Sequence, residues 1–142
     1  MATKKVEWPP VYLVSACLLG LPTRYDGLSC PSAECRRQLA GALWVPVCPE
    51  QLGGLSTPRS PADLVGGNGA KVLVGSARVV NRDGIEVTAQ FVKGAEVVLS
   101  LARELSVAGV FLKSGSPSCG CGRVTGVTAA LLLRDGFPLQ EF

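Results

Sequence analysis

Residues 111–122 read FLKSGSPSCGCG, and this stretch determines both the expected fold and the expected site. The apolar run 109–112 is followed by Lys113 and then by a loop of Ser, Gly and Pro that carries Cys119 and Cys121. A buried strand that ends abruptly in small, permissive residues is typical of an α/β protein that presents a site at a strand's carboxyl end. Glycine lets the backbone approach a ligand closely, so we expect this loop to form part of a binding site.

Two other apolar runs precede this stretch, residues 11–16 (VYLVSA) and 43–47 (LWVPV). Continuous apolar runs of this length are typical of strands that are buried on both faces of a parallel sheet. Each run leads to a cysteine, Cys17 and Cys48, with Gly or Pro close behind. Pro46 cannot donate a hydrogen bond to a neighbouring strand, so we expect the second run at a sheet edge or in an irregular strand.

Periodicity and capping residues predict the remaining elements. They are, in order, a helix over 32–41, a hairpin of 72–81 with 85–87, a helix over 88–106 with Thr88 as N-cap, a helix over 125–134 with Thr125 as N-cap, and a strand over 137–142. The glycine-rich segment 53–70 is expected to be a long functional loop. This order predicts one three-layer α/β domain, residues 11–142, with a mainly parallel sheet of Rossmann-like topology. Residues 1–10 are expected to be a mobile lead-in.

The composition excludes several classes of function. The chain has 142 residues, 47% hydrophobic and 18% charged, which indicates one globular domain. A net charge of +3 carried by scattered Lys and Arg does not indicate a nucleic-acid partner. No apolar stretch is long enough to cross a membrane, and residues 1–10 lack the apolar core of a signal peptide. We therefore expect a cytoplasmic protein with no membrane partner, in a compartment where disulfides are uncommon.

The cysteines are the candidate ligands, because the chain has six Cys and no His. In parallel sheets the ligand sites lie at the carboxyl ends of the strands, so we expect Cys17, Cys48 and Cys119 to converge there. Without a C-x-x-C pair, spacing alone leaves two alternatives, a three-thiolate metal site or three small core hydrophobes. We expect Cys30 and Cys35 to be small hydrophobic residues of the core.

The absence of His also restricts the chemistry. It excludes His-based acid–base catalysis and Cys–His nucleophilic pairs. Thiolates suit zinc or an iron–sulfur cluster, but structural zinc favours four ligands in tight pairs and catalytic zinc usually recruits His. A 4Fe-4S cluster on three cysteines needs no His and leaves one iron open to substrate. Cys121 is the less expected ligand, since alternate residues on an extended chain point apart.

Several blocks of the sequence resemble one bacterial family, the domain of unknown function 523, whose characterised members are thiouracil desulfurases. The blocks are SACLLG (15–20), RYDG (24–27), VPVCPEQLGGL with TPR (45–59), LKSGSPSCG (112–120) and GVTAALL (126–132), so that the resemblance covers about residues 11–142. It implies a small α/β enzyme that uses a 4Fe-4S cluster with one open iron. The substrate would be a small thiolated molecule such as 2-thiouracil, converted to uracil and hydrogen sulfide.

The resemblance also implies roles for individual residues. Cys17, Cys48 and Cys119 would bind the cluster, and the other functional groups would be Glu50, Lys113 and Ser116. The chain departs from the family pattern at Thr23, where many relatives have a cysteine, and in the short segment CGRVT (121–125). A cluster with an open iron is expected to be lost or replaced during aerobic purification, as the freed thiols oxidise.

Each of the non-cysteine residues has a simpler alternative. Glu50 is expected to act as general base or general acid, or else to be a surface carboxylate or a partner of Arg59. Lys113 would orient substrate or offset cluster charge, or be an ordinary strand-terminal lysine. Ser116 would position substrate or bond to its own backbone. The alternative function is a non-catalytic iron–sulfur or zinc-binding module for redox or carrier work. The sequence makes no prediction of oligomeric state.

Overall fold

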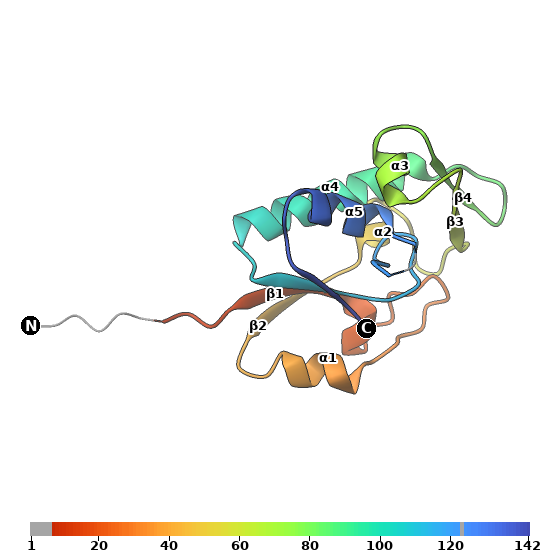
Figure 1. Cartoon of the computed structure of the whole chain (residues 1–142). Coiled ribbons are helices and arrows are strands. Elements are labelled where there is room, and N and C mark those ends of the chain that lie inside the picture. The colour runs from red at the N-terminus through yellow and green to blue at the C-terminus, as the bar shows by residue number, and fades with distance from the viewer. Residues whose placement is uncertain (1–6, 123) are drawn as a thin grey trace, which may run out of the picture.

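The fold is built on a four-stranded parallel sheet (Figure 1), in a computed structural model that describes residues 7–122 and 124–142. The strands are β1 (Val11–Ser15), β2 (Leu43–Val47), β5 (Gly109–Leu112) and β6 (Leu139–Glu141), in the spatial order β2-β1-β5-β6. Each neighbouring pair is parallel. Strand β2 lies at an edge, as Pro46 predicted.

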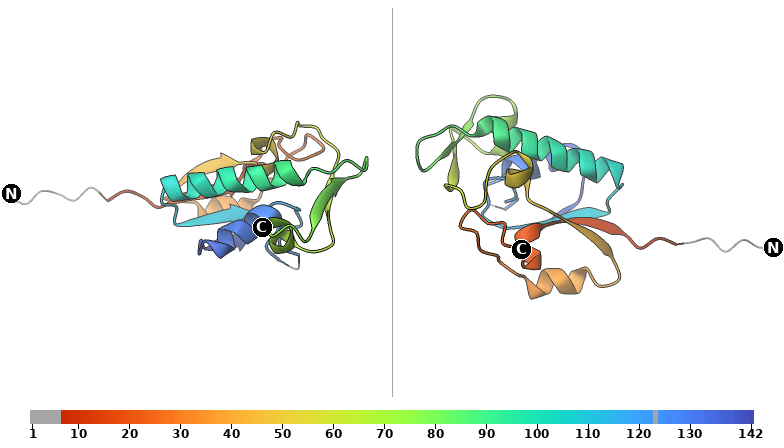
Figure 2. Two further views of the ribbon diagram at one scale, coloured as in Figure 1. Left: turned by 90° about the horizontal axis from the view of Figure 1, so that it is seen from above. Right: turned by 180° about the vertical axis from the view of Figure 1, so that it is seen from behind.

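Helices cover both faces of this sheet, which confirms the predicted three-layer α/β architecture (Figures 1 and 2). The short α1 (Ala33–Gln38) and the 3-10 turn η1 (Ala16–Leu19) lie on one face. The other face carries α2 (Pro49–Leu52), α4 (Thr88–Glu104) and α5 (Val127–Arg134). The chain runs from β1 outward to β2, then returns across β1 to β5 and continues to β6. Right-handed crossovers in opposite directions place their helices on opposite faces. The point where the order reverses, between β1 and β5, is therefore the expected ligand position.

Two cores hold the layers together. Leu13 and Val14 are neighbours on β1 that point to opposite faces, and both are fully buried. This double burial explains why the strand reads as an unbroken apolar run. The larger core joins the sheet to α4 and α5 through residues that include Phe91, Ala95, Val98, Val110, Leu112 and Leu131. The smaller core, under α1, contains Val14, Leu18, Leu19, Cys35, Leu39 and Phe111.

The long helix α4 buries Phe91, Ala95, Val98 and Ala102. The N-caps of the last two helices were wrongly predicted. Val87 occupies the N-cap of α4, and Thr88 instead accepts a hydrogen bond through Oγ1 from the N–H of Val79 at 2.9 Å. Gly126, not Thr125, occupies the N-cap of α5. The Thr88 hydroxyl and the Thr125 carbonyl each accept from a residue outside the helix, Val79 and Gly69, and sequence alone does not reveal these contacts.

The predicted hairpin of 72–81 with 85–87 is wrong. Residues 69–73 form α3 (Gly69–Leu73), whose first turn is capped by the side chain of Asn68 on the N–H of Lys71. Strand β4 (Arg78–Asn81) pairs antiparallel with β3 (Ala62–Val65), from within the segment predicted as a long loop. Of the predicted pairing, a single bridge between Val80 and Glu86 is present.

The reason for this difference lies at Asn81. Its Oδ1 accepts hydrogen bonds from the N–H groups of Asp83 and Ile85, which closes the expected turn. The chain then enters α4 at Thr88 before a second strand can extend, so β4 pairs with β3 instead. The β3–β4 sheet stands near the ends of β1 and β5 (Figure 1) and supplies an outer wall to the site described below.

The predicted lead-in of residues 1–10 is described only in part. Residues 1–6 lie outside the described residues, and residues 7–10 carry neither helix nor strand. The division of the chain into this lead-in and a domain over 11–142 stays a prediction. Within the described part of the chain, no helix has both the length and the apolar character needed to cross a membrane.

Candidate active site

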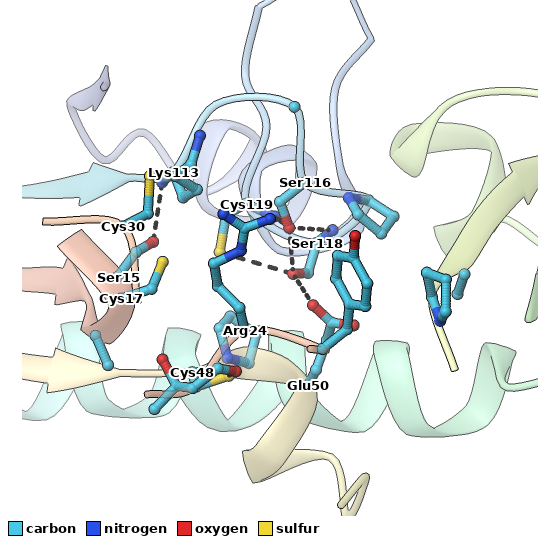
Figure 3. Close-up of a pocket in the computed structure, with 18 of the residues that line it drawn as sticks. Ser15, Cys17, Arg24, Cys30, Cys48, Glu50, Lys113, Ser116, Ser118 and Cys119 are labelled. Atoms are coloured by element: carbon cyan, nitrogen blue, oxygen red, sulfur yellow. Dashed lines mark hydrogen bonds between the residues drawn. The ribbon is translucent and has the colours of Figure 1, made fainter. Parts of the chain in front are cut away.

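A cavity of about 350 Å³ opens where β1, β2 and β5 end (Figure 3). It lies at the reversal of strand order, where parallel α/β sheets bind their ligands. All six residues proposed from the sequence line it, namely Cys17, Cys48, Glu50, Lys113, Ser116 and Cys119. The fold therefore brings together groups that lie up to about a hundred residues apart in the chain.

Each of the three cysteines is placed by a different strand end. Cys17 lies in η1 directly after β1, and Cys48 occupies the N-cap of α2 directly after β2. Cys119 lies in the loop that follows β5. Cys17 and Cys119 are buried, whereas Cys48 is half-buried and its thiol donates to the carbonyl of Thr23 at 3.7 Å.

Helix α2 packs directly on α4 because two glycines face each other. A Cβ added at Gly53 would lie 1.9 Å from the carbonyl oxygen of Gln90, and one at Gly94 would lie 1.9 Å from that of Pro49. Neither position tolerates a larger residue without displacing backbone. This close approach fixes the short helix that carries Glu50.

The loop before α5 is held rigidly around Cys119. Ser116 Oγ accepts hydrogen bonds from the N–H groups of Ser118 at 3.2 Å and Cys119 at 3.1 Å. The first N–H groups of α5 donate back to the carbonyls of Pro117 and Ser118. These groups would otherwise lack partners at a helix N-terminus. The Ser116 hydroxyl is thus engaged with its own backbone, the simpler of its two alternatives.

Ser118 is a site residue that sequence reasoning missed. Its side chain is buried, and its Oγ lies 3.0 Å from Ser116 Oγ. The same hydroxyl is positioned to donate to Glu50 Oε2 at 3.4 Å or to Cys119 Sγ at 3.7 Å (Figure 3). The only signal in the sequence was its position next to Cys119.

Glu50 pairs with Arg59, as its alternative interpretation held. The guanidinium Nε lies 3.3 Å from Glu50 Oε1. The side chain of Arg59 is 6% exposed and that of Glu50 is 14% exposed. The other carboxylate oxygen faces Ser118 and the cavity. The ion pair therefore fixes the orientation of the carboxylate, with one oxygen on Arg59 and the other toward the cavity.

Lys113 lies at the end of β5 and is tied to β1. Its N–H donates to Ser15 Oγ at 3.0 Å, and its Nζ donates to the carbonyl and hydroxyl of Ser114 at 3.0 and 3.1 Å. Its positive charge opposes the effects that raise the pKa of Cys17. This geometry places the ammonium at the cavity wall, where it offsets negative charge.

The electrostatics of the cavity favour neutral thiols when no cation is present. Burial raises the pKa of Cys119 to about 12, although hydrogen bonds from Ser15 and Ser118 act in the opposite direction. Burial is also the main reason that the pKa of Cys17 is raised, followed by the nearby thiols of Cys30 and Cys48. A bound metal group would have to displace these protons, since metal ligation requires thiolates.

The prediction that Cys30 is a small core hydrophobe is wrong. Cys30 is half-buried and lines the cavity beside Cys17. Its N–H donates to the Cys17 carbonyl at 2.9 Å, and this hydrogen bond brings the loop that carries Cys30 back to η1. Cys35 does pack in the smaller core, and it is fully buried. Cys121 is half-buried, and its N–H donates to Glu141 Oε2 at 2.8 Å, outside the group that lines the cavity.

Comparisons with known proteins identify the family and the fold. The family model described as 2-thiouracil desulfurase matches residues 12–141. The uncharacterized protein YbbK of Bacillus subtilis (strain 168) is 42% identical over 137 residues, which covers 88% of this chain and 91% of that protein. The solved structure of the 4Fe-4S-dependent thiouracil desulfidase TudS superposes with a TM-score of 0.78 and 38% identity, and the match covers 95% of this chain and 91% of TudS. The chain belongs to the 2-thiouracil desulfurase family.

Proposed function

We propose that this protein is an iron–sulfur-dependent desulfurase that removes sulfur from a thiolated pyrimidine base such as 2-thiouracil. The net reaction consumes one water and gives uracil and hydrogen sulfide, so no external oxidant or reductant is needed. The observation that carries this proposal is the meeting of Cys17, Cys48 and Cys119 with Glu50 around one cavity. Membership of the 2-thiouracil desulfurase family supports it.

The residues around the cavity fit a 4Fe-4S cluster. Cysteine thiolates are the usual ligands of such clusters, and three of them line a cavity of about 350 Å³. Among residues 7–122 and 124–142, no three His, Cys, Asp or Glu side chains are arranged to hold a metal ion. The preference for a cluster rests on donor chemistry, since structural zinc favours four ligands and catalytic zinc usually recruits His, which this chain lacks. Cys17, Cys48 and Cys119 would hold it.

When bound, the cluster supplies an iron without a protein thiolate, which can bind a soft thiocarbonyl sulfur and polarise the carbon–sulfur bond. Glu50 is the general base in this proposal. Its Oε1 is held by Arg59, and its Oε2 faces the cavity, so it can take a proton from a water directed at the substrate carbon. Lys113 offsets negative charge near Cys17.

The two serines connect this base to the rest of the site. Ser116 Oγ and Ser118 Oγ are 3.0 Å apart, and Ser118 reaches Glu50 Oε2. When Ser118 donates to Glu50, Ser116 donates to Ser118, which forms a continuous chain of hydroxyl groups. This chain orients the carboxylate, because its last hydroxyl holds Oε2.

The direct test is an assay of 2-thiouracil desulfuration. The protein is purified in the absence of oxygen and its cluster is reconstituted with iron and sulfide under the same conditions. We expect close to four irons and four sulfides per chain, a brown absorbance, and equal amounts of uracil and sulfide released from 2-thiouracil. The absence of oxygen matters, because the open iron exposes the cluster to oxidation. A colourless, zinc-loaded protein would exclude the cluster. A brown protein that passes its cluster to an acceptor, without turning over thiolated pyrimidines, would indicate a carrier instead.

Replacing Ser118 by alanine should lower kcat about tenfold or more while the iron content stays at the wild-type value, since one hydroxyl link to Glu50 is lost. Ser116→Ala is the matched variant. Its hydroxyl supports two backbone N–H groups, so it should also lower the free energy of unfolding by about 1–3 kcal/mol. Thermal unfolding of both variants, measured beside their steady-state kinetics, separates the two effects. Wild-type kcat for Ser118→Ala would remove this serine from the mechanism.

A further inference from the structure

Arg59 is a buried cation between the segment that carries Cys48 and Glu50 and the loop that carries Thr23. Its side chain is only 6% exposed. Its backbone N–H also donates to the Tyr25 carbonyl at 2.8 Å, so both parts of the residue tie the same segments together. Burying a guanidinium is costly unless its charge and its donors are matched, so the position of this side chain requires several partners.

The guanidinium has an acceptor for each of its five N–H donors. The contacts are Nε to Glu50 Oε1 at 3.3 Å, Nη1 to Thr57 Oγ1 at 2.8 Å and to the Ser56 carbonyl at 3.2 Å, and Nη2 to the Thr23 carbonyl at 3.0 Å and to Cys48 Sγ at 3.9 Å. Two of these acceptors belong to the proposed reaction, the thiol of Cys48 and the carboxylate of Glu50. One rigid, planar group therefore fixes both.

We propose that Arg59 is a positioning residue that couples the cluster ligand Cys48 to the general base Glu50. This inference rests on the proposed function and assigns a role to a residue outside the ligand and base set. Because the guanidinium holds Glu50 Oε1, Oε2 is the carboxylate oxygen that faces Ser118. By donating to Cys48 Sγ, it places an N–H group and a positive charge beside a sulfur that would bind the cluster.

The contact with sulfur has a consequence that a purely structural arginine would not have. Hydrogen bonds to cluster sulfur atoms and nearby positive charge stabilise the more negative, reduced cluster, and so they raise its reduction potential. Removing them makes the potential more negative. Lysine cannot replace this arrangement, because its donors radiate from one atom and cannot reach Glu50, Thr23 and Cys48 in one plane.

The test uses Arg59→Lys and Arg59→Gln in reconstituted, oxygen-free protein, with three measurements: iron content, cluster reduction potential and steady-state kinetics. We expect iron content near wild type, and a potential that becomes more negative from wild type to Arg59→Lys to Arg59→Gln. We expect kcat to fall about 10- to 100-fold, the scale usual for residues behind a metal ligand, with a smaller change in KM. Arg103→Lys is the matched control. Arg103 pairs with Asp135 on an exposed surface, so its replacement should change neither the reduction potential nor kcat.

Thr57→Val covers the case in which an Arg59 variant does not fold. It keeps the arginine and its charge but removes one of the acceptors that orient the guanidinium. We expect changes in the same direction as for Arg59→Lys, but smaller. Wild-type potential and kcat in the folded variants would overturn the coupling role while leaving the desulfurase proposal intact. A wild-type protein that binds no cluster and releases no sulfide would instead overturn the proposed function.

Discussion

Protein in which Cys17, Cys48 or Cys119 is replaced by serine should hold no stable 4Fe-4S cluster after anaerobic reconstitution and should not desulfurate 2-thiouracil at a detectable rate. A serine hydroxyl is harder and far less acidic than a thiol, so it is a poor ligand for iron in a cluster. With three protein ligands in the proposed site, losing one leaves two of the four iron atoms without a protein thiolate. Iron and sulfide per chain, the visible absorbance and an electron paramagnetic resonance spectrum of the reduced protein measure the effect.

Two other cysteines supply the controls for this experiment. Cys35 is fully buried in the smaller core, so Cys35→Ser should keep the cluster while a buried hydroxyl costs about 1–3 kcal/mol of stability. Cys30 is the sharper control, because it lines the same cavity beside Cys17. We expect Cys30→Ser to retain the cluster as well. Equal cluster loss at Cys30 would contradict the assignment of the three ligands.

The positions of the three thiols could be predicted because the strands before them carry a strong signal. Strands β1 and β5 are covered on both faces, and such strands read as continuous apolar runs, whereas β2 is an edge strand in which only Val47 is buried. Parallel strands with right-handed crossovers then leave little freedom in where their carboxyl ends lie. The ends of β1, β2 and β5 therefore defined one edge, and with it the cavity, before any contact between side chains was known.

The contacts around the thiols could not be predicted in the same way. Ser118 reaches Glu50 across 68 positions of sequence, and no periodic pattern reports which serine of SPS points toward it. Cys30 enters the cavity through one backbone hydrogen bond to Cys17, which composition does not reveal. The pairing of β3 with β4 is similar, since four-residue strands with mixed burial have a weak alternation signal.

Replacing Glu50 by glutamine should lower the turnover of 2-thiouracil about a hundredfold or more, which is about 2.7 kcal/mol of transition-state stabilisation, while the cluster stays at the wild-type level. Glutamine keeps the size of the side chain and an oxygen that can accept from Arg59, but it cannot accept a proton from water at neutral pH. Glu50 is not among the three proposed ligands, so base and cluster should be separable. Steady-state kinetics and iron content of the same preparation measure both.

The ion pair with Arg59 requires one further measurement. Because the Arg59 side chain is only 6% exposed, losing its charged partner also lowers the stability of the fold. The kcat of the variant must therefore be measured at a temperature well below its midpoint of thermal unfolding. Asp63→Asn is the matched control, since this carboxylate lines the outer wall of the same cavity on β3. We expect it to change kcat less than tenfold, because no contact joins it to the hydroxyl chain of the two serines. Full activity of Glu50→Gln with an intact cluster would make Glu50 structural. The proton would then have to travel through Lys113, Ser116 or bound water.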